Sequence, residues 1–180
     1  MATQVQVDEL LTKMEEERGR FLVQARGLSD EAAVWRPEGK TGEEEWSAKE
    51  QLAHLWEMER SYIAWVNAAL RENGADLTGV RGAPVAIPIE RANAHRVDEL
   101  VEALEKERAG TLTFIKSLKL EDFDRTARQP MFGELTVLQW LRSFYRHDRM
   151  HTDQIAGRDP EYKPRFVNGQ EPDQRRRSNV

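Results

Sequence analysis

The sequence contains no cysteine among its 180 residues. Disulfides, thiolate metal ligands and a cysteine nucleophile are therefore excluded, and any thiol chemistry would need a thiol from another molecule. Metal ligands would have to be histidines or carboxylates. The chain has four histidines, which are His54, His95, His147 and His151.

Long apolar runs and an excess of positive charge are also lacking. No stretch approaches the roughly 20 apolar residues that span a bilayer, and the first residues do not form a basic start followed by an apolar run. The formal net charge of −5 gives no general attraction to phosphate backbones. The arginines at residues 175–177 are interpreted as a solvated tail. We therefore expect a cytoplasmic protein that binds neither membranes nor nucleic acid.

The residues that are present indicate one helical domain. Apolar positions recur at three- and four-residue spacings in four segments, so we expect helices over residues 7–28, 47–73, 91–119 and 136–157. Ser47 with Glu50, and Thr136 with Gln139, fit the capping box that begins a helix. The length suits a single domain.

The connecting segments complete the predicted fold. Residues 74–90 carry glycines and prolines with no clear period and indicate a long connection rather than a strand, and residues 120–135 also lack a period. We predict an all-α four-helix bundle over residues 1–158, with a long crossover between helices 2 and 3. Residues 159–180 are predicted to be an irregular, partly disordered C-terminal tail.

His147 and His151 stand one turn apart on the predicted fourth helix and face inward or nearly so. A lone buried histidine is usually a hydrogen-bonded core residue, whereas two on one face could share a metal ion. His54 lies at the edge of the apolar arc of its helix, where periodicity alone is compatible with a surface position. His95 lies opposite the apolar stripe and is interpreted as a surface residue.

Asp148 falls within the apolar stripe of the fourth helix, where an unpaired carboxylate would be costly. It should therefore have a partner. Either it accepts the free N–H of a ligand histidine, or it pairs with an arginine from a neighbouring helix in a structural role. The sequence leaves both interpretations open.

Two stretches together resemble a known family. Residues 46–55 read WSAKEQLAHL and residues 145–155 read YRHDRMHTDQI, and their order and spacing are similar to those of the DinB-like superfamily, a group of proposed metalloenzymes also called DinB/YfiT-like. The resemblance covers roughly residues 7–157. It implies a four-helix bundle in up-down-down-up order, in which His54, His147 and His151 hold one divalent ion.

Three histidines leave at least one coordination position for water or a substrate atom. Zinc, nickel and iron all accept imidazole, so the ligand set does not choose the metal. Because family members that resemble this chain include thiol-dependent S-transferases, we consider a metal-dependent enzyme in which a bound water or an external thiol attacks a small electrophilic molecule. Asp148 would then orient a ligand, and Glu57 or Tyr145 could transfer protons.

The alternative is a non-catalytic, stress-related metal- or ligand-binding protein. A pocket opening onto the fourth coordination position would favour chemistry, whereas a side chain filling that position would favour structure. A homodimer is possible, because dimers are frequent among the proteins that this chain resembles and its charged helix faces could form an interface. Such charged faces equally serve solubility.

Overall fold

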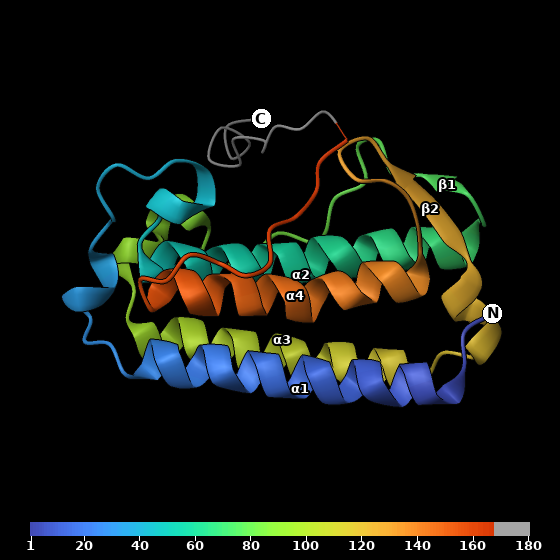
Figure 1. The fold of residues 1–180 in the computed structure, drawn as a ribbon, viewed down its shortest axis with the longest axis horizontal. Helices are drawn as coiled ribbons and strands as arrows, with labels where there is room; N and C mark the ends of the chain where they lie inside the picture. Colours follow the sequence, from blue (N-terminus) through green and yellow to red (C-terminus); the bar gives the residue numbers. More distant parts are fainter. Residues whose placement is uncertain (168–180) are drawn as a thin grey trace.

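A computed structural model describes residues 1–167, and four long helices dominate it. They are α1 (Gln4–Arg26), α2 (Ala48–Arg71), α3 (Val97–Lys116) and α4 (Val137–Ile155). Figure 1 shows them side by side, with α1 and α4 running in one direction and α2 and α3 in the other. Each packs against two of the others: α1 against α3 and α4, and α2 against α3 and α4. The predicted four-helix bundle is confirmed, in a chain that is mostly rather than wholly helical.

Two of the helices begin where the capping boxes predict. The Ser47 amide donates to the Glu50 carboxylate at 2.8 Å, and the Glu50 amide donates to the Ser47 hydroxyl at 3.2 Å. The same reciprocal pair joins Thr136 and Gln139 at the start of α4. Each box satisfies amides that have no partner within the helix. The third helix begins later than predicted, because residues Ile89–Ala94 form a separate 3-10 helix, η3.

A small three-stranded sheet lies at one end of the bundle (Figure 1). Its strands are β1 (Ala75–Asp76), β2 (Thr126–Gln129) and β3 (Gly133–Thr136). β1 pairs parallel to β2, and β2 pairs antiparallel to β3. The expectation that residues 74–90 contain no strand is therefore wrong at their start. A strand of two residues is too short to show the alternation by which strands are recognised.

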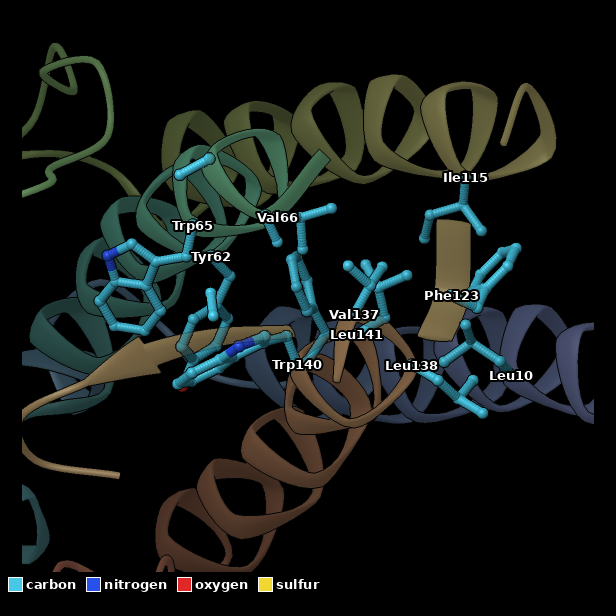
Figure 2. Packing of buried hydrophobic residues seen from close by; sticks show 14 of the residues in the cluster. Leu10, Tyr62, Trp65, Val66, Ile115, Phe123, Val137, Leu138, Trp140 and Leu141 are labelled. Atoms are coloured by element: carbon cyan, nitrogen blue, oxygen red, sulfur yellow. The ribbon is translucent and has the colours of Figure 1, made fainter. Parts of the chain in front are cut away.

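The buried apolar side chains form two clusters, one toward each end of the bundle. Figure 2 shows the cluster in which the rings of Tyr62, Trp65 and Trp140 lie together. Along α1, the buried Arg18 lies between Met14 of this cluster and Phe21 of the other. On α3, which runs in the opposite direction, a second buried arginine, Arg108, lies between Leu104 of the other cluster and Ile115 of this one. A layer of buried polar side chains therefore separates the two apolar clusters.

The chain continues without a helix or strand beyond α4 as far as the structure describes it. The rings of Phe166 and Phe132 lie 5.3 Å apart, and the Val167 amide donates to the Met131 carbonyl at 2.8 Å. The start of the predicted tail thus packs on the bundle. Residues 168–180, including the arginines at 175–177, lie outside the described residues. None of the described helices is both long and apolar enough to cross a membrane.

Candidate metal centre

The three histidines implied by the resemblance come together in the structure, and a glutamate joins them. His54 comes from α2, His147 and His151 from α4, and Glu43 from a short 3-10 helix, η2 (Gly42–Glu45). One ligand atom from each of these four buried residues lies within 4.8 Å of the others. We call this group the histidine cluster. Sequence reasoning missed Glu43.

The distances within the histidine cluster suit a divalent ion. The Nε2 atom of His147 lies 3.2 Å from that of His54 and 3.0 Å from that of His151. A tetrahedral ion bound at about 2.0–2.1 Å places its ligand nitrogens about 3.3 Å apart. The Glu43 carboxylate lies 3.2 to 3.5 Å from the three Nε2 atoms. Three nitrogens and a carboxylate therefore converge on one point, as the donors of a metal site do.

One histidine of the cluster has its tautomer set by a neighbour. The side-chain amide of Gln51 donates to the Trp46 carbonyl at 3.1 Å, which turns the Gln51 oxygen toward His151 Nδ1 at 3.0 Å. His151 Nδ1 must then carry the hydrogen, because the amide oxygen can only accept. The lone pair of His151 Nε2 is left facing the cluster, as metal binding requires.

The other two histidines are less completely bonded. The Nδ1 atoms of His54 and His147 are buried and have no hydrogen-bond partner among the described residues. Their Nε2 atoms contact other members of the cluster instead. Three imidazoles cannot all be satisfied by one another, because each hydrogen bond needs one donor and one acceptor. A cation would accept the lone pairs of all three.

The charge states in the cluster also suit a cation. Burial lowers the pKa of His151 well below its usual value, and the neighbouring His147 lowers it further, so His151 is neutral at pH 7. Burial alone would raise the pKa of Glu43, but its interactions with His54 and His147 outweigh burial and hold that pKa well below the ordinary value. For His151 and Glu43, the neutral imidazole and the ionised carboxylate are the forms that bind metal.

A cavity of about 670 Å³ adjoins the histidine cluster. Glu43 and His147 line it, together with Tyr62 and Trp140, whereas His54 is fully buried behind them. The accessible edge of the cluster is therefore the edge formed by Glu43 and His147. The cavity opens onto that edge, which is the arrangement expected of a catalytic site. The Glu43 side chain lies at the same edge, where it could also occupy the fourth coordination position.

Other residues considered for the site lie elsewhere. Glu57 is exposed on α2, and Tyr145 packs beside Arg146. Neither is among the lining residues of the cavity. His95 lies outside the cluster, and its Nδ1 atom is 3.2 Å from the Glu99 carboxylate. Glu43 and Tyr62 both line the cavity, and the ring centroid of Tyr62 lies 6.2 Å from that of His147.

Asp148 is fully buried and takes the second of its two proposed roles. It accepts from Arg18 of α1 at 2.8 and 3.1 Å and from Arg108 of α3 at 3.0 Å. Among the described residues, no hydrogen bond joins it to a histidine, so the idea that Asp148 directly holds a ligand histidine is corrected. The guanidinium groups of Arg18 and Arg108 extend from the facing helices and occupy the hydrogen-bonding positions of its oxygens.

A fourth side chain completes this second buried group. Glu59 of α2 accepts from Arg18 at 2.8 Å and from Arg108 at 2.9 and 3.2 Å. Each of the four helices thus contributes one residue to what we call the arginine–carboxylate network, made of Arg18, Glu59, Arg108 and Asp148. Burial alone would raise the pKa of Asp148, but the charges of Arg108 and Arg18 lower it, so the carboxylate stays ionised.

Comparison with known proteins places these observations in a family. Residues 13–155 match the family model described as the DinB superfamily. YuaE of Bacillus subtilis (strain 168) is 28% identical over 143 residues, which cover 72% of this chain and 85% of YuaE.

Two solved structures share the fold. The first is described as "YfiT from Bacillus subtilis is a probable metal-dependent hydrolase with an unusual four-helix bundle topology". It matches with a TM-score of 0.68 and 15% identity, over 87% of each chain. The second, TT2238, described as a four-helix bundle protein, matches with a TM-score of 0.60 and 22% identity, over 84% of this chain and 98% of TT2238. With a family model matched along most of its length and a buried group able to hold a divalent ion, this chain belongs to the DinB superfamily.

Proposed function

We propose that this protein binds one divalent metal ion through His54, His147 and His151 and hydrolyses a small molecule bound in the adjoining cavity. The observation that carries the proposal is the convergence of three Nε2 atoms and the Glu43 carboxylate at the wall of that cavity. The description of YfiT as a probable metal-dependent hydrolase supports the same reaction class. Zinc, nickel and iron all suit the three imidazoles.

The residues divide the work according to their positions. The three histidines would hold the ion, which when bound supplies a Lewis acid that makes water a better nucleophile. Glu43 lies beside them and lines the cavity, so we assign it as the proton acceptor. It takes the proton that the attacking water loses and returns it to the leaving group. The water is thus divided between the two products, and no other reactant is needed.

A second candidate function rests on the same glutamate. The Glu43 carboxylate lies as close to His147 and His151 as a fourth ligand would. If it coordinates the ion, the four positions of a tetrahedral site are filled and the site is a closed one. The protein would then be a non-catalytic metal-binding protein.

Metal analysis tests the proposed site directly. The protein is purified without a histidine tag, and bound metal is measured in the wild type, His54→Ala and the double variant His147→Ala/His151→Ala. We expect one ion per chain in the wild type, none in these variants, and an unchanged content in the control His95→Ala, whose histidine lies outside the cluster. Failure to bind stoichiometric zinc, nickel or iron after reconstitution would overturn the proposal.

Glu43→Gln separates the two candidate functions. If Glu43 is the proton acceptor, the variant keeps its ion and loses hydrolysis of the ester, amide and phosphoester substrates that the wild type cleaves. Assays with and without an added thiol show whether thiol, rather than water, is the nucleophile. If the variant loses its ion and the wild type turns over none of these substrates, the closed site is correct.

A further inference from the structure

The cavity beside the histidine cluster has a wall that the helices do not supply. Residues 161–166, which follow α4, line one side of it. We call this segment the C-terminal wall. It is joined to the bundle by ion pairs between Glu161 and Arg149 and between Lys163 and Glu44, and by packing of Phe166 on Phe132. The cavity is therefore a property of the whole described chain and not of the bundle alone.

The lining of the cavity is mixed, and one part of it is apolar and aromatic. Its carbon-rich lining consists of Met58, Tyr62, Phe132, Leu135, Trp140 and Phe166. The Phe132 ring packs edge-on against Trp140 at 5.9 Å and beside Phe166 at 5.3 Å. Such surfaces favour ligands with an aliphatic or aromatic body, because burying that body removes apolar area from water.

The charges around the cavity do not cancel. The acidic lining residues Glu43 and Glu161 face the histidines and Arg149 respectively, and Lys163 pairs with Glu44. Arg146 and Arg165 also line the cavity and are exposed. Neither has a carboxylate within ion-pair distance in the part of the chain that the structure describes.

Arg146 is held in place without losing its charge. Its guanidinium lies 5.9 Å from the ring centroid of Tyr145 and 5.8 Å from that of Tyr162, within the range of cation–π attraction. A side-chain hydrogen bond also joins Arg146 to Tyr162. These contacts restrict the direction of the guanidinium, and because it has five N–H donors, others can reach a ligand. A planar guanidinium binds carboxylate, sulfonate and phosphate groups well.

We propose that the cavity binds organic anions that have an apolar or aromatic body, with the body against the aromatic lining and the acidic group at Arg146 and Arg165. The claim that these anions are the substrates of the metal site rests on the proposed function. The binding itself depends on the cavity and the two arginines. It can therefore be measured on protein from which metal has been removed.

A matched pair of fluorescent probes tests this binding. 8-Anilinonaphthalene-1-sulfonate is an aromatic anion, and N-phenyl-1-naphthylamine has the same aromatic skeleton without the sulfonate. Titrations of the chelator-treated protein should show saturable binding of the anion at one per chain. In the double variant Arg146→Gln/Arg165→Gln we expect affinity for the anion to fall about tenfold or more, as lost charge-assisted hydrogen bonds predict. Affinity for the neutral probe should change by less than about twofold.

Two further variants locate the effect. Arg91→Gln removes an exposed arginine on η3 that does not line the cavity, and it should leave both affinities unchanged. Ser143 lines the cavity from α4, so Ser143→Trp should fill it and abolish binding of both probes, with circular dichroism confirming the helical fold. Unchanged anion affinity in the arginine variant, an equal loss of both probes there, or binding that survives in Ser143→Trp would overturn the proposal.

The probe titrations and the metal and substrate assays can fail independently of each other. A protein that selects the anionic probe but holds no metal overturns the proposed hydrolase and leaves this inference standing. A protein that holds its ion and cleaves substrates, but binds both probes alike in wild type and arginine variant, overturns this inference alone.

Discussion

The histidine cluster and the arginine–carboxylate network are both buried and polar, and they share α4, yet they differ in how their charges are balanced. Asp148 lies between His147 and His151 in the sequence, but its oxygens face Arg18 and Arg108. In the network two positive charges meet two negative charges through charge-assisted hydrogen bonds, and among the described residues one guanidinium nitrogen, Arg18 Nη1, lacks a partner. In the histidine cluster, three nitrogens of one kind converge, and two ring nitrogens lack a partner among the described residues.

On the proposed function, this difference separates a structural role for the network from a functional role for the histidine cluster. A buried polar group whose partners all come from the protein helps to specify how the helices pack. A buried group whose own atoms cannot satisfy one another needs something from outside. Adjacent residues of one helix, His147 and Asp148, therefore belong to different kinds of site.

The largest expected effect is on folding stability, and it should come from the network. Asp148→Ala leaves Arg18 and Arg108 short of a buried counter-charge, so we expect the free energy of unfolding to fall by about 3–5 kcal/mol. His54→Ala, in protein without metal, should cost only about 1 kcal/mol. Urea unfolding of chelator-treated protein measures both. As a control, Glu105→Ala removes an exposed pair with Arg26 and should cost less than about 1 kcal/mol. If Asp148→Ala and His54→Ala lowered the free energy of unfolding equally, the two groups would not differ in their contribution to stability.

Metal should act on one of the two groups only. A ligand at 100 times its dissociation constant stabilises the folded state by about 2.7 kcal/mol. We expect this gain in the wild type and in Asp148→Asn, whose histidine cluster is intact, but none in His54→Ala. Unfolding with and without added zinc provides the comparison. A gain in His54→Ala would place the ion elsewhere.

The bond from Gln51 to His151 should influence affinity for the ion more than stability. Gln51→Leu removes the acceptor that fixes the His151 tautomer, and partners of this kind typically account for a 10- to 100-fold difference in metal affinity. Competition with a chromogenic chelator measures the change. Gln51→Glu keeps an acceptor at the same place and should recover most of the affinity. If leucine and glutamate have the same effect, the bond does not act through the tautomer.

The two groups should also respond to acid in different pH ranges. The pKa of His151 is lowered well below 6.5 by burial and by His147, so as pH falls past 6.5 the unfolded chain gains a proton that the folded chain does not. Stability present above pH 6.5 is then lost progressively, by at most about 1.4 kcal/mol per pH unit. The pKa of Asp148 is lowered from 3.8, so its contribution is lost only below about that pH. Unfolding of metal-free protein between about pH 5 and 7 should show a slope that His151→Gln reduces. An unchanged slope would assign it to another group.

Local signals in the sequence predicted the helices well. The capping boxes at Ser47 and Thr136 involve residues three apart, and the structure contains both. The pair His147 and His151 needed only the helical period. The sheet was missed because Ala75 pairs with Ala127, far along the chain, in a strand too short to have a pattern of its own.

The remainder of the site depended on contacts between distant segments. Glu43 begins a run of three glutamates, and nothing local distinguishes it from Glu44 and Glu45. It is the 3-10 helix η2 that turns Glu43 into the bundle. Burial of Asp148 was predicted from its place in the apolar stripe. An arginine partner was one of its two interpretations, but the sequence did not identify which arginines, because Arg18 shares α1 with the exposed Arg20 and Arg26 and Arg108 stands in a run of charged residues on α3.

The network has a consequence for the order of events in folding. Because it draws one residue from every helix, it forms only when all four helices have met. The histidine cluster joins residues separated by about a hundred positions, so closing that loop in the unfolded chain carries a large entropy cost. On the proposed function, an ion would therefore find its full set of ligands only after the bundle has assembled. Such late interactions slow the unfolding rate and leave the refolding rate almost unchanged, so bound metal should lengthen the lifetime of the folded protein without helping it to fold.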